Sequence, residues 1–166
     1  FNDGTTIVER LKGEEVMDFT EKLNSRGKVT ATTVYYYENA LERAVETAAD
    51  SRMRKSTTYR GDLDADNDGV VTDAELAGAQ ITSVSWYNIT DSSGIERLKG
   101  EEVLDFTEKY NSSGKITSTT ISLYEDTLLR AEDAGGDDRI RESVTYRGDL
   151  DANNDGKVDA AELVGA

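Results

Sequence analysis

The chain contains no cysteine, no histidine and no proline among its 166 residues. Without cysteine it forms no disulfide and offers no thiolate. Without histidine it lacks the imidazole base and the side chains that most often bind zinc, copper and iron. The metals that remain are hard cations, which bind oxygen ligands. Any metal site in this chain must therefore be built from carboxylate, amide, hydroxyl and backbone oxygens.

Long apolar runs and positive charge are also scarce. No run of about 18 apolar residues is present, so we expect no direct membrane insertion. Lys and Arg number 19 against 34 Asp and Glu, a net charge of -15. Nucleic acid and anionic membranes both require a basic surface, so neither is expected as a partner. The Ser and Thr residues have no evident base partner, and we expect no enzyme activity.

The sequence is internally duplicated. The segment ERLKGEEV at residues 9–16 recurs unchanged at residues 96–103, and YRGDLDA at residues 59–65 recurs at residues 146–152. Both pairs have the same offset (96 − 9 = 87 and 146 − 59 = 87). This regular offset indicates a tandem repeat, the pattern that decides the architecture before any other feature.

The repeat predicts a domain organisation. We expect repeat 1 over residues 1–79, a connecting strand or linker over residues 80–86, and repeat 2 over residues 87–166. The chain begins with Phe1 rather than Met, so we expect a processed or excised product. A piece of a longer array and an ordinary two-domain protein with one linker both fit this arrangement.

Each repeat contains one acidic loop with a metal-binding pattern, at residues 64–75 and 151–162. Both fit D-x-[DN]-x-[DN]-G-x5-E, in which side chains at positions 1, 3, 5 and 9, a carbonyl at 7 and a carboxylate at 12 surround the ion. The predicted ligands are Asp64, Asp66, Asp68, Val70, Thr72 and Glu75 in the first loop, and Asp151, Asn153, Asp155, Lys157, Asp159 and Glu162 in the second.

These loops resemble the calcium-binding loops of the EF-hand family, and this resemblance implies two Ca²⁺ sites. The segments before the loops, residues 54–63 and 141–150, read as strand and turn, where an EF-hand has its first helix. The two loops are also too far apart to form an ordinary EF-hand pair. The layout is more similar to the calcium loops of extracellular modules such as dockerins, although paired dockerin loops lie closer together.

The remaining pattern is typical of β-structure. Residues 28–37 and 115–123 are rich in Val, Ile, Thr and Tyr, and each follows a turn that ends in Gly. The preceding residues 18–23 and 105–110 alternate apolar and polar side chains, as a hairpin partner does. Further strands are expected at residues 52–59, 81–86 and 139–146.

The segments 38–49 and 125–136 are ambiguous between helix and strand. The first has a helical apolar stripe, but the second carries Gly135 and Gly136, which weaken a helix, so strand is favoured. Counting them gives six or seven strands per repeat, which predicts a mainly β protein of two tandem β-sandwich (Ig-like) repeats, each with a calcium loop and a short following helix. Tandem α+β repeats are the alternative.

Two weaker motifs are present: an RGD tripeptide in both repeats, and an N-glycosylation pattern in the second repeat only. RGD tripeptides at residues 60–62 and 147–149 are interpreted as Gly-enabled turns into the loops. Asn88 and Asn111 match the N-glycosylation pattern, which matters only for an exported chain.

These features predict a calcium-stabilised structural protein located outside the cell or at its surface, the unit of a filament, stalk, adhesin or surface layer. Its expected partners are copies of itself or neighbouring repeats, with assembly by strand exchange as one route. The alternatives are a calcium-dependent binding module, dockerin-like or carbohydrate-binding, and an intracellular calcium buffer or sensor.

Overall fold

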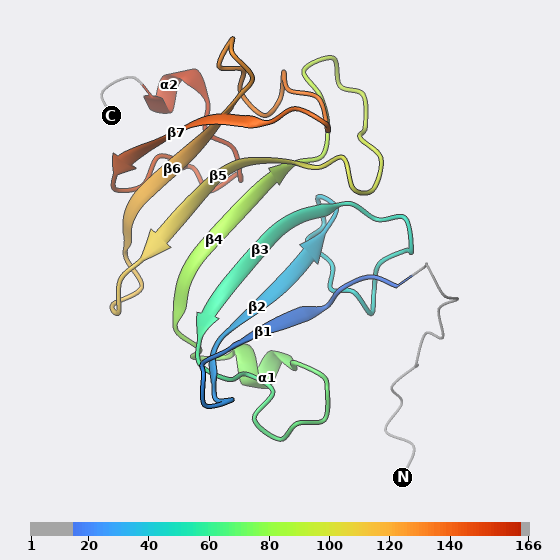
Figure 1. Ribbon diagram of the computed structural model, residues 1–166, viewed down its shortest axis with the longest axis vertical. Coiled ribbons are helices and arrows are strands. Elements are labelled where there is room, and N and C mark those ends of the chain that lie inside the picture. The colour runs from blue at the N-terminus through green and yellow to red at the C-terminus, as the bar shows by residue number, and fades with distance from the viewer. Residues whose placement is uncertain (1–14, 164–166) are drawn as a thin grey trace.

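The computed structural model describes residues 15–163, which form a single antiparallel sheet of seven strands (Figure 1). The strands lie in the sheet in the same order as in the chain. They are β1 (Phe19–Leu23), β2 (Val29–Tyr37), β3 (Met53–Arg60), β4 (Ile81–Asn88), β5 (Val103–Tyr110), β6 (Ile116–Tyr124) and β7 (Ile140–Arg147). Two helices, α1 (Asp73–Leu76) and α2 (Ala160–Leu163), follow β3 and β7.

The predicted hairpins are confirmed. β1 pairs with β2 and β5 with β6, each across a short turn. In the first turn the Asn24 side chain accepts hydrogen bonds from the backbone N–H groups of Arg26 (2.8 Å) and Lys28 (3.1 Å). Gly27 has a φ of 73°, a left-handed conformation that glycine adopts without steric cost. Asn111 and Gly114 repeat this arrangement in the second hairpin.

The prediction of two β-sandwiches is wrong for the described residues. β2, β3 and α1 match β6, β7 and α2 residue for residue at the offset of 87 (116 − 29, 140 − 53 and 160 − 73). β4 lies between the two halves and pairs with β3 on one side and β5 on the other. The two repeats therefore share one continuous sheet, and the strand expected at residues 81–86 joins them.

The excess strand count came from the segments 38–49 and 125–136. Both are chains of turns, with one isolated bridge each, Tyr37↔Glu42 and Tyr124↔Leu129. They fold back over the sheet because their small apolar residues are buried there: Ala131 is 0% and Ala134 3% exposed. Their form is thus set by tertiary packing and is neither helix nor strand.

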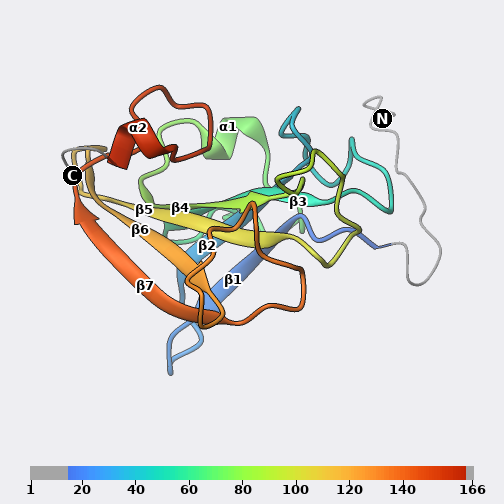
Figure 2. The same cartoon turned by 90° about the horizontal axis from the view of Figure 1, so that it is seen from above.

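One face of the sheet carries the core. Figure 2 shows α1 and α2 on the same side of the sheet. Val34 and Tyr59 pack there with Leu63 and Val71 from the first acidic loop and its approach. The equivalent second cluster contains Phe106, Ile121, Leu150 and Val158. The acidic loops therefore form part of the fold, because they supply the residues that cover the sheet.

On the other face of the sheet, the side chains of the strands are mostly small and hydroxylated. Cross-strand hydroxyl pairs join Thr33 to Thr58 (2.9 Å), Ser85 to Thr107 (2.8 Å) and Thr120 to Thr145 (2.9 Å). Such pairs stabilise a sheet by a few tenths of a kcal/mol to about 1 kcal/mol each. These cross-strand pairs give the Thr-rich and Ser-rich strands a structural role in the sheet.

Some sequence features lie outside the described residues. These are most of the first ERLKGEEV segment and the ends of the duplication, residues 1–8 and 164–166. Within the described part of the chain, neither four-residue helix has the length or apolar character needed to cross a membrane.

Candidate metal centres

Each acidic loop begins at a fixed turn after a strand. Gly61 follows β3 with a φ of 84° and donates its N–H to the Thr30 carbonyl (3.0 Å). The buried Thr32 hydroxyl donates to the Gly61 carbonyl (2.9 Å) and accepts from the Leu63 N–H (3.2 Å). Thr119, Gly148 and Leu150 repeat this arrangement. One strand hydroxyl thus sets the direction in which each loop leaves the sheet, and the RGD tripeptide forms this turn.

An arginine holds each loop further along. Arg43 donates from Nε to Asp18 (2.9 Å) and from Nη2 to the Val71 carbonyl (3.1 Å). In the second repeat Arg130 donates to Asp105 (2.9 Å) and to the Val158 carbonyl (3.0 Å). Val71 and Val158 occupy position 8 of the loops, and both side chains are buried. The middle of each loop is therefore anchored by an apolar side chain and by a charged hydrogen bond.

Three predicted ligands converge in the first loop. One carboxylate oxygen from each of Asp64, Asp66 and Asp68 lies within 4.8 Å of the others. Ca²⁺ binds oxygens at 2.3–2.6 Å, so two ligands of one ion are separated by at most about 5 Å. Asp64 also accepts hydrogen bonds from the backbone N–H groups of Asp68 (3.0 Å) and Gly69 (3.1 Å). The spacing and the all-oxygen donor set fit a hard divalent cation.

The last part of the first loop is arranged differently. Glu75 accepts hydrogen bonds from the Thr72 N–H (2.8 Å) and hydroxyl (2.9 Å), which caps α1. Backbone hydrogen bonds from Thr72, and more weakly from Ala65, hold the pKa of Glu75 below its usual value. The Val70 N–H donates to Asp68 (2.8 Å). Position 12 thus lies against position 9 and near the start of the loop, with its carboxylate ionised.

The second loop repeats the backbone geometry. Asp151 accepts from the N–H groups of Asp155 (3.0 Å) and Gly156 (3.0 Å), and Asn153 accepts from Asp155 (2.9 Å). The Lys157 N–H donates to Asp155 (2.9 Å). At the end of the loop, Glu162 accepts from the Asp159 N–H (3.0 Å). The predicted residues in the second loop therefore occupy positions equivalent to those in the first.

The two loops differ in their electrostatic environment. Burial raises the pKa of Asp151 to about 6, and the nearby Asp155 and Glu162 carboxylates add to the effect. Burial also raises the pKa of Glu108 on β5 to about 7, with Asp149 and Asp151 contributing. Both groups carry a charge that the site disfavours at neutral pH. A bound cation would relieve this cost.

The Glu108 shift predicts a pH dependence of stability in chelator. Its folded pKa of about 7 lies above the unfolded value of about 4.3. The contribution to stability is complete below pH 4 and is lost as the pH rises through 7. We expect Glu108→Gln to flatten the fall in melting temperature between about pH 5 and 8, whereas Glu21→Gln, its exposed counterpart, should flatten it less. Identical slopes for wild type and Glu108→Gln would contradict the assignment.

The second loop also packs on the sheet in a way that the first does not. Gly156 is buried, and a Cβ placed on it would lie 2.6 Å from the Trp86 ring of β4. The Arg54 guanidinium from β3 donates to the Gly156 carbonyl (2.9 Å) and the Tyr87 carbonyl, and lies 5.3 Å from the Trp86 ring centroid. The counterpart Gly69 has open space around it. Arg54 of the first repeat and Trp86 of the connecting strand therefore form a platform for the loop of the second repeat.

This platform predicts unequal effects for two equivalent arginines. Arg54→Met leaves two carbonyls without their donor, one of them on buried Gly156, and should lower the free energy of unfolding by about 1–3 kcal/mol. The equivalent Arg141 is exposed and forms an ion pair with Asp126 (3.2 Å). Arg141→Met should therefore change stability by less than about 0.5 kcal/mol. Urea unfolding of both variants measures the difference, and equal losses would contradict the platform.

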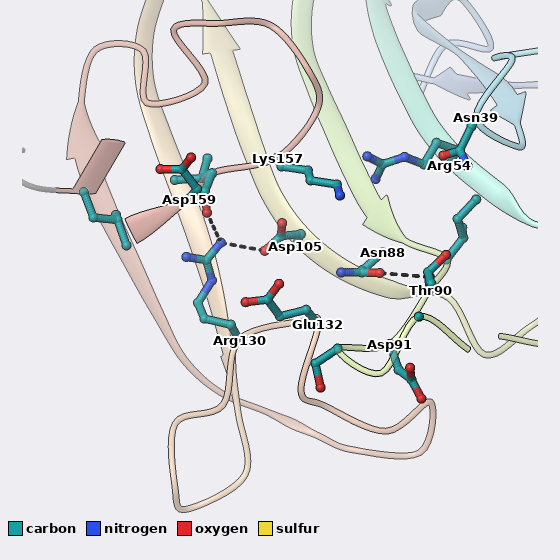
Figure 3. A pocket seen from close by; sticks show the side chains of 15 residues that line it. Asn39, Arg54, Asn88, Thr90, Asp91, Asp105, Arg130, Glu132, Lys157 and Asp159 are labelled. Carbon is teal, nitrogen blue, oxygen red and sulfur yellow. Dashed lines mark hydrogen bonds and ion pairs between the residues drawn. The ribbon is translucent and has the colours of Figure 1, made fainter. Parts of the chain in front are cut away.

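A polar cavity of about 580 Å³ opens beside the second loop (Figure 3). Arg54, Arg130 and Lys157 line it together with Asp105, Glu132 and Asp159. Arg130 is already bound to Asp105. Asn88 also lines the cavity, and its side chain accepts a hydrogen bond from the Thr90 N–H (3.0 Å). This mixture of charges suits hydrogen bonding to a polar ligand.

Sequence reasoning missed the residues that hold the loops. They are Thr32, Arg43 and Asp18, their counterparts Thr119, Arg130 and Asp105, and the platform residues Arg54 and Trp86. The first six could have been found, because each residue type recurs at the offset of 87. Trp86 lies in the connecting strand and has no repeated partner within the chain.

The structure thus brings Asp64, Asp66 and Asp68 together at the end of a clamped strand and gives the second loop the same backbone geometry. Comparison with known proteins adds no relative: no protein-family model, no curated protein and no solved structure matches this chain.

Proposed function

We propose that this chain is a calcium-stabilised structural repeat protein of the cell exterior, the unit of a filament, stalk, adhesin or surface layer. The observation that carries the proposal is the attachment of each acidic loop to the sheet. Leu63 and Val71 are buried against the first half, and Leu150 and Val158 against the second. An ion that orders such a loop would also order the cover of the core.

The residues that would hold the ions are the two sets of loop oxygens. In the first loop these are the converging carboxylates of Asp64, Asp66 and Asp68. Calcium would neutralise the repulsion between carboxylates at close range, which costs about 1 kcal/mol or more per pair. Glu75 would need to turn from the Thr72 N–H toward the cluster to join it. Binding would therefore compete with the cap of α1.

The sensor alternative is disfavoured by the elements beside the loops. A sensor responds through two helices that swing apart and expose an apolar groove. Here a strand precedes each loop and a four-residue helix follows it. This arrangement favours a structural role, and weak extracellular-type sites, with Kd near 10⁻⁴–10⁻³ M in such modules, would be filled outside the cell.

A calcium titration by calorimetry tests the proposal. Two sites are expected, and Asp64→Asn and Asp151→Asn should each remove or weaken one of them by about tenfold or more. Asp62→Asn and Asp149→Asn change the same charge two residues before each loop and should leave the affinity nearly unchanged. Absence of binding at millimolar Ca²⁺, or equal effects of all four variants, would overturn the proposal.

The polar cavity favours a second candidate, a calcium-dependent binding module. Lys157 and Asp159 of the second loop line it, so ion binding would alter its shape and charge. NMR titration with neutral and acidic oligosaccharides, with and without chelator, tests this candidate. Calcium-dependent shifts of residues lining the cavity would support it, and shifts elsewhere would contradict it.

A further inference from the structure

The two halves of the chain are joined by a strand that has the same kind of neighbour on each side. β4 pairs with β3, and β3 is the equivalent of β7 at the offset of 87. β7 has the same length as β3 and lies at the edge of the sheet. In the described part of the chain, no strand pairs with the outer edge of β7. The first repeat therefore shows what a completed β7 edge would look like.

The backbone of β7 is oriented for such a pairing. Gly61 and Gly148 donate to the Thr30 and Thr117 carbonyls, so both copies present the same side to their preceding strand. The adjacent Arg60 N–H points the other way and donates to the Gln80 carbonyl (2.9 Å), at the start of β4. By equivalence the Arg147 N–H lies on the free edge of β7. Alternation along a strand places Thr145 and Ser143 on the same edge.

Side-chain exposure shows what this edge lacks. Arg54 and Ser56 on β3 are 7% and 8% exposed. Their counterparts Arg141 and Ser143 on β7 are exposed. In the first repeat Trp86 and the Gly156 carbonyl cover Arg54, and Ser56 lies opposite Ser85 of β4. β7 thus has the same strand length and backbone orientation as β3, but its side chains are exposed where those of β3 are buried by neighbouring elements.

We propose that the outer edge of β7 binds an extended strand with the side-chain pattern of β4, supplied in antiparallel orientation by a further repeat of this type. In β3 the register places Val84 opposite Thr57 and Ser85 opposite Ser56. The added strand would place the same two positions opposite Val144 and Ser143. This inference deepens the proposed structural role, on which it rests, by naming the joint between units.

β7 is preferred over the other sheet edge, β1. β1 has five residues, whereas its counterpart β5 has eight. A strand added to β1 would meet a shorter ladder than the one that β4 forms with β5. β7 offers all eight positions that β3 offers, so the longer set of main-chain hydrogen bonds is available there.

A synthetic peptide of residues 80–88, QITSVSWYN, tests the proposal at saturating Ca²⁺ with the full chain. Saturable 1:1 binding is expected by fluorescence anisotropy, with amide shifts at Ser143, Thr145 and Arg147. Two N-methylated peptides provide the control. Methylation of the alternate residues whose N–H groups face β7 should weaken binding by about tenfold or more, and methylation of the outward set should have little effect.

A second measurement avoids any dependence on the solubility of the peptide. The same nine residues are appended after Ala166, the position equivalent to Ala79, and a scrambled sequence serves as the control. The native extension should raise the melting temperature and slow amide exchange at Ser143, Thr145 and Arg147 by about tenfold or more. The scrambled extension should do neither.

Three results would overturn the inference: no difference between native and scrambled extensions, equal loss with both methylation patterns, or a peptide footprint on β1. Calcium binding can be measured independently in the same samples. If calcium binds and the strand does not, the joint is wrong and the structural role stands. If the strand binds and calcium does not, the joint stands and the calcium-stabilised role is wrong.

Discussion

Removal of calcium is expected to lower the free energy of unfolding by about 5 kcal/mol, when the starting free concentration is 100 times the dissociation constant of both sites. Each site then contributes about 2.7 kcal/mol, because the ion binds the folded chain and not the unfolded one. This is a large part of the 5–15 kcal/mol that typical domains possess. Melting followed by circular dichroism, with Ca²⁺ and with chelator, measures the change.

Two controls separate specific binding from charge screening. Mg²⁺ at the same ionic strength should protect much less, because it prefers smaller, near-octahedral sites and releases its water reluctantly. The Asp64→Asn/Asp151→Asn double variant should lose most of the calcium response. A melting temperature that rises equally with Ca²⁺ and Mg²⁺, or a double variant that responds as the wild type does, would contradict the assignment of the loops.

Gly156→Ala is expected to be among the most damaging single substitutions in the described chain. Gly156 has a φ of 76°, so any side chain there costs about 1–2 kcal/mol. The new methyl group would also lie 2.6 Å from the Trp86 ring, and relief of such overpacking costs a further 1–3 kcal/mol or so. We expect a total loss of about 2–5 kcal/mol in urea unfolding.

Gly69→Ala is the matched control. Gly69 occupies the same loop position with a φ of 81°, but a Cβ there would meet no atom within 4 Å. The loss should be limited to the conformational cost of about 1–2 kcal/mol. If the two alanines cost the same, the second loop does not pack against Trp86. The Trp86→Ala background, which removes the clash, should bring the two effects together.

The parts of the fold that the sequence predicted are those set by local chemistry. The hairpin turn at residues 24–27 requires an Asn that can accept from the backbone and a Gly that can adopt positive φ, and both act within five residues. The alternation in β3 and β7 predicted strands with the correct bounds to within one residue. Duplication strengthened both predictions, because each pattern occurred twice.

The number of sheets could not be predicted in this way. The local sequence of residues 81–88 is the same whether this strand pairs on both sides or is a free linker. The difference lies in its pairing with β3 and β5, which are distant in sequence. The segment 38–49 was likewise undetermined. Its turns depend on Arg43, which reaches back 25 residues to Asp18 and forward to the Val71 carbonyl. Such contacts leave no periodic signal.

For the candidate site, the ligand pattern was readable and its surroundings were not. The spacing of Asp64, Asp66 and Asp68 predicted the cluster that the structure brings together. The different packing of the two loops against the sheet could not be predicted, because both loop sequences satisfy the same ligand pattern. It arises from Arg54 on β3 of the first half and from Trp86 on the connecting strand β4.

The agreement between strand order and chain order has a kinetic consequence. Each strand finds its partners among its sequence neighbours, so the sheet can grow outward from either hairpin without the long crossover connections that slow folding. The longest connection between adjacent strands, the 20 residues between Arg60 and Ile81, contains the first acidic loop. An ion bound there would shorten the search that brings β4 to β3. Calcium would then act on the rate of folding as well as on the persistence of the folded state.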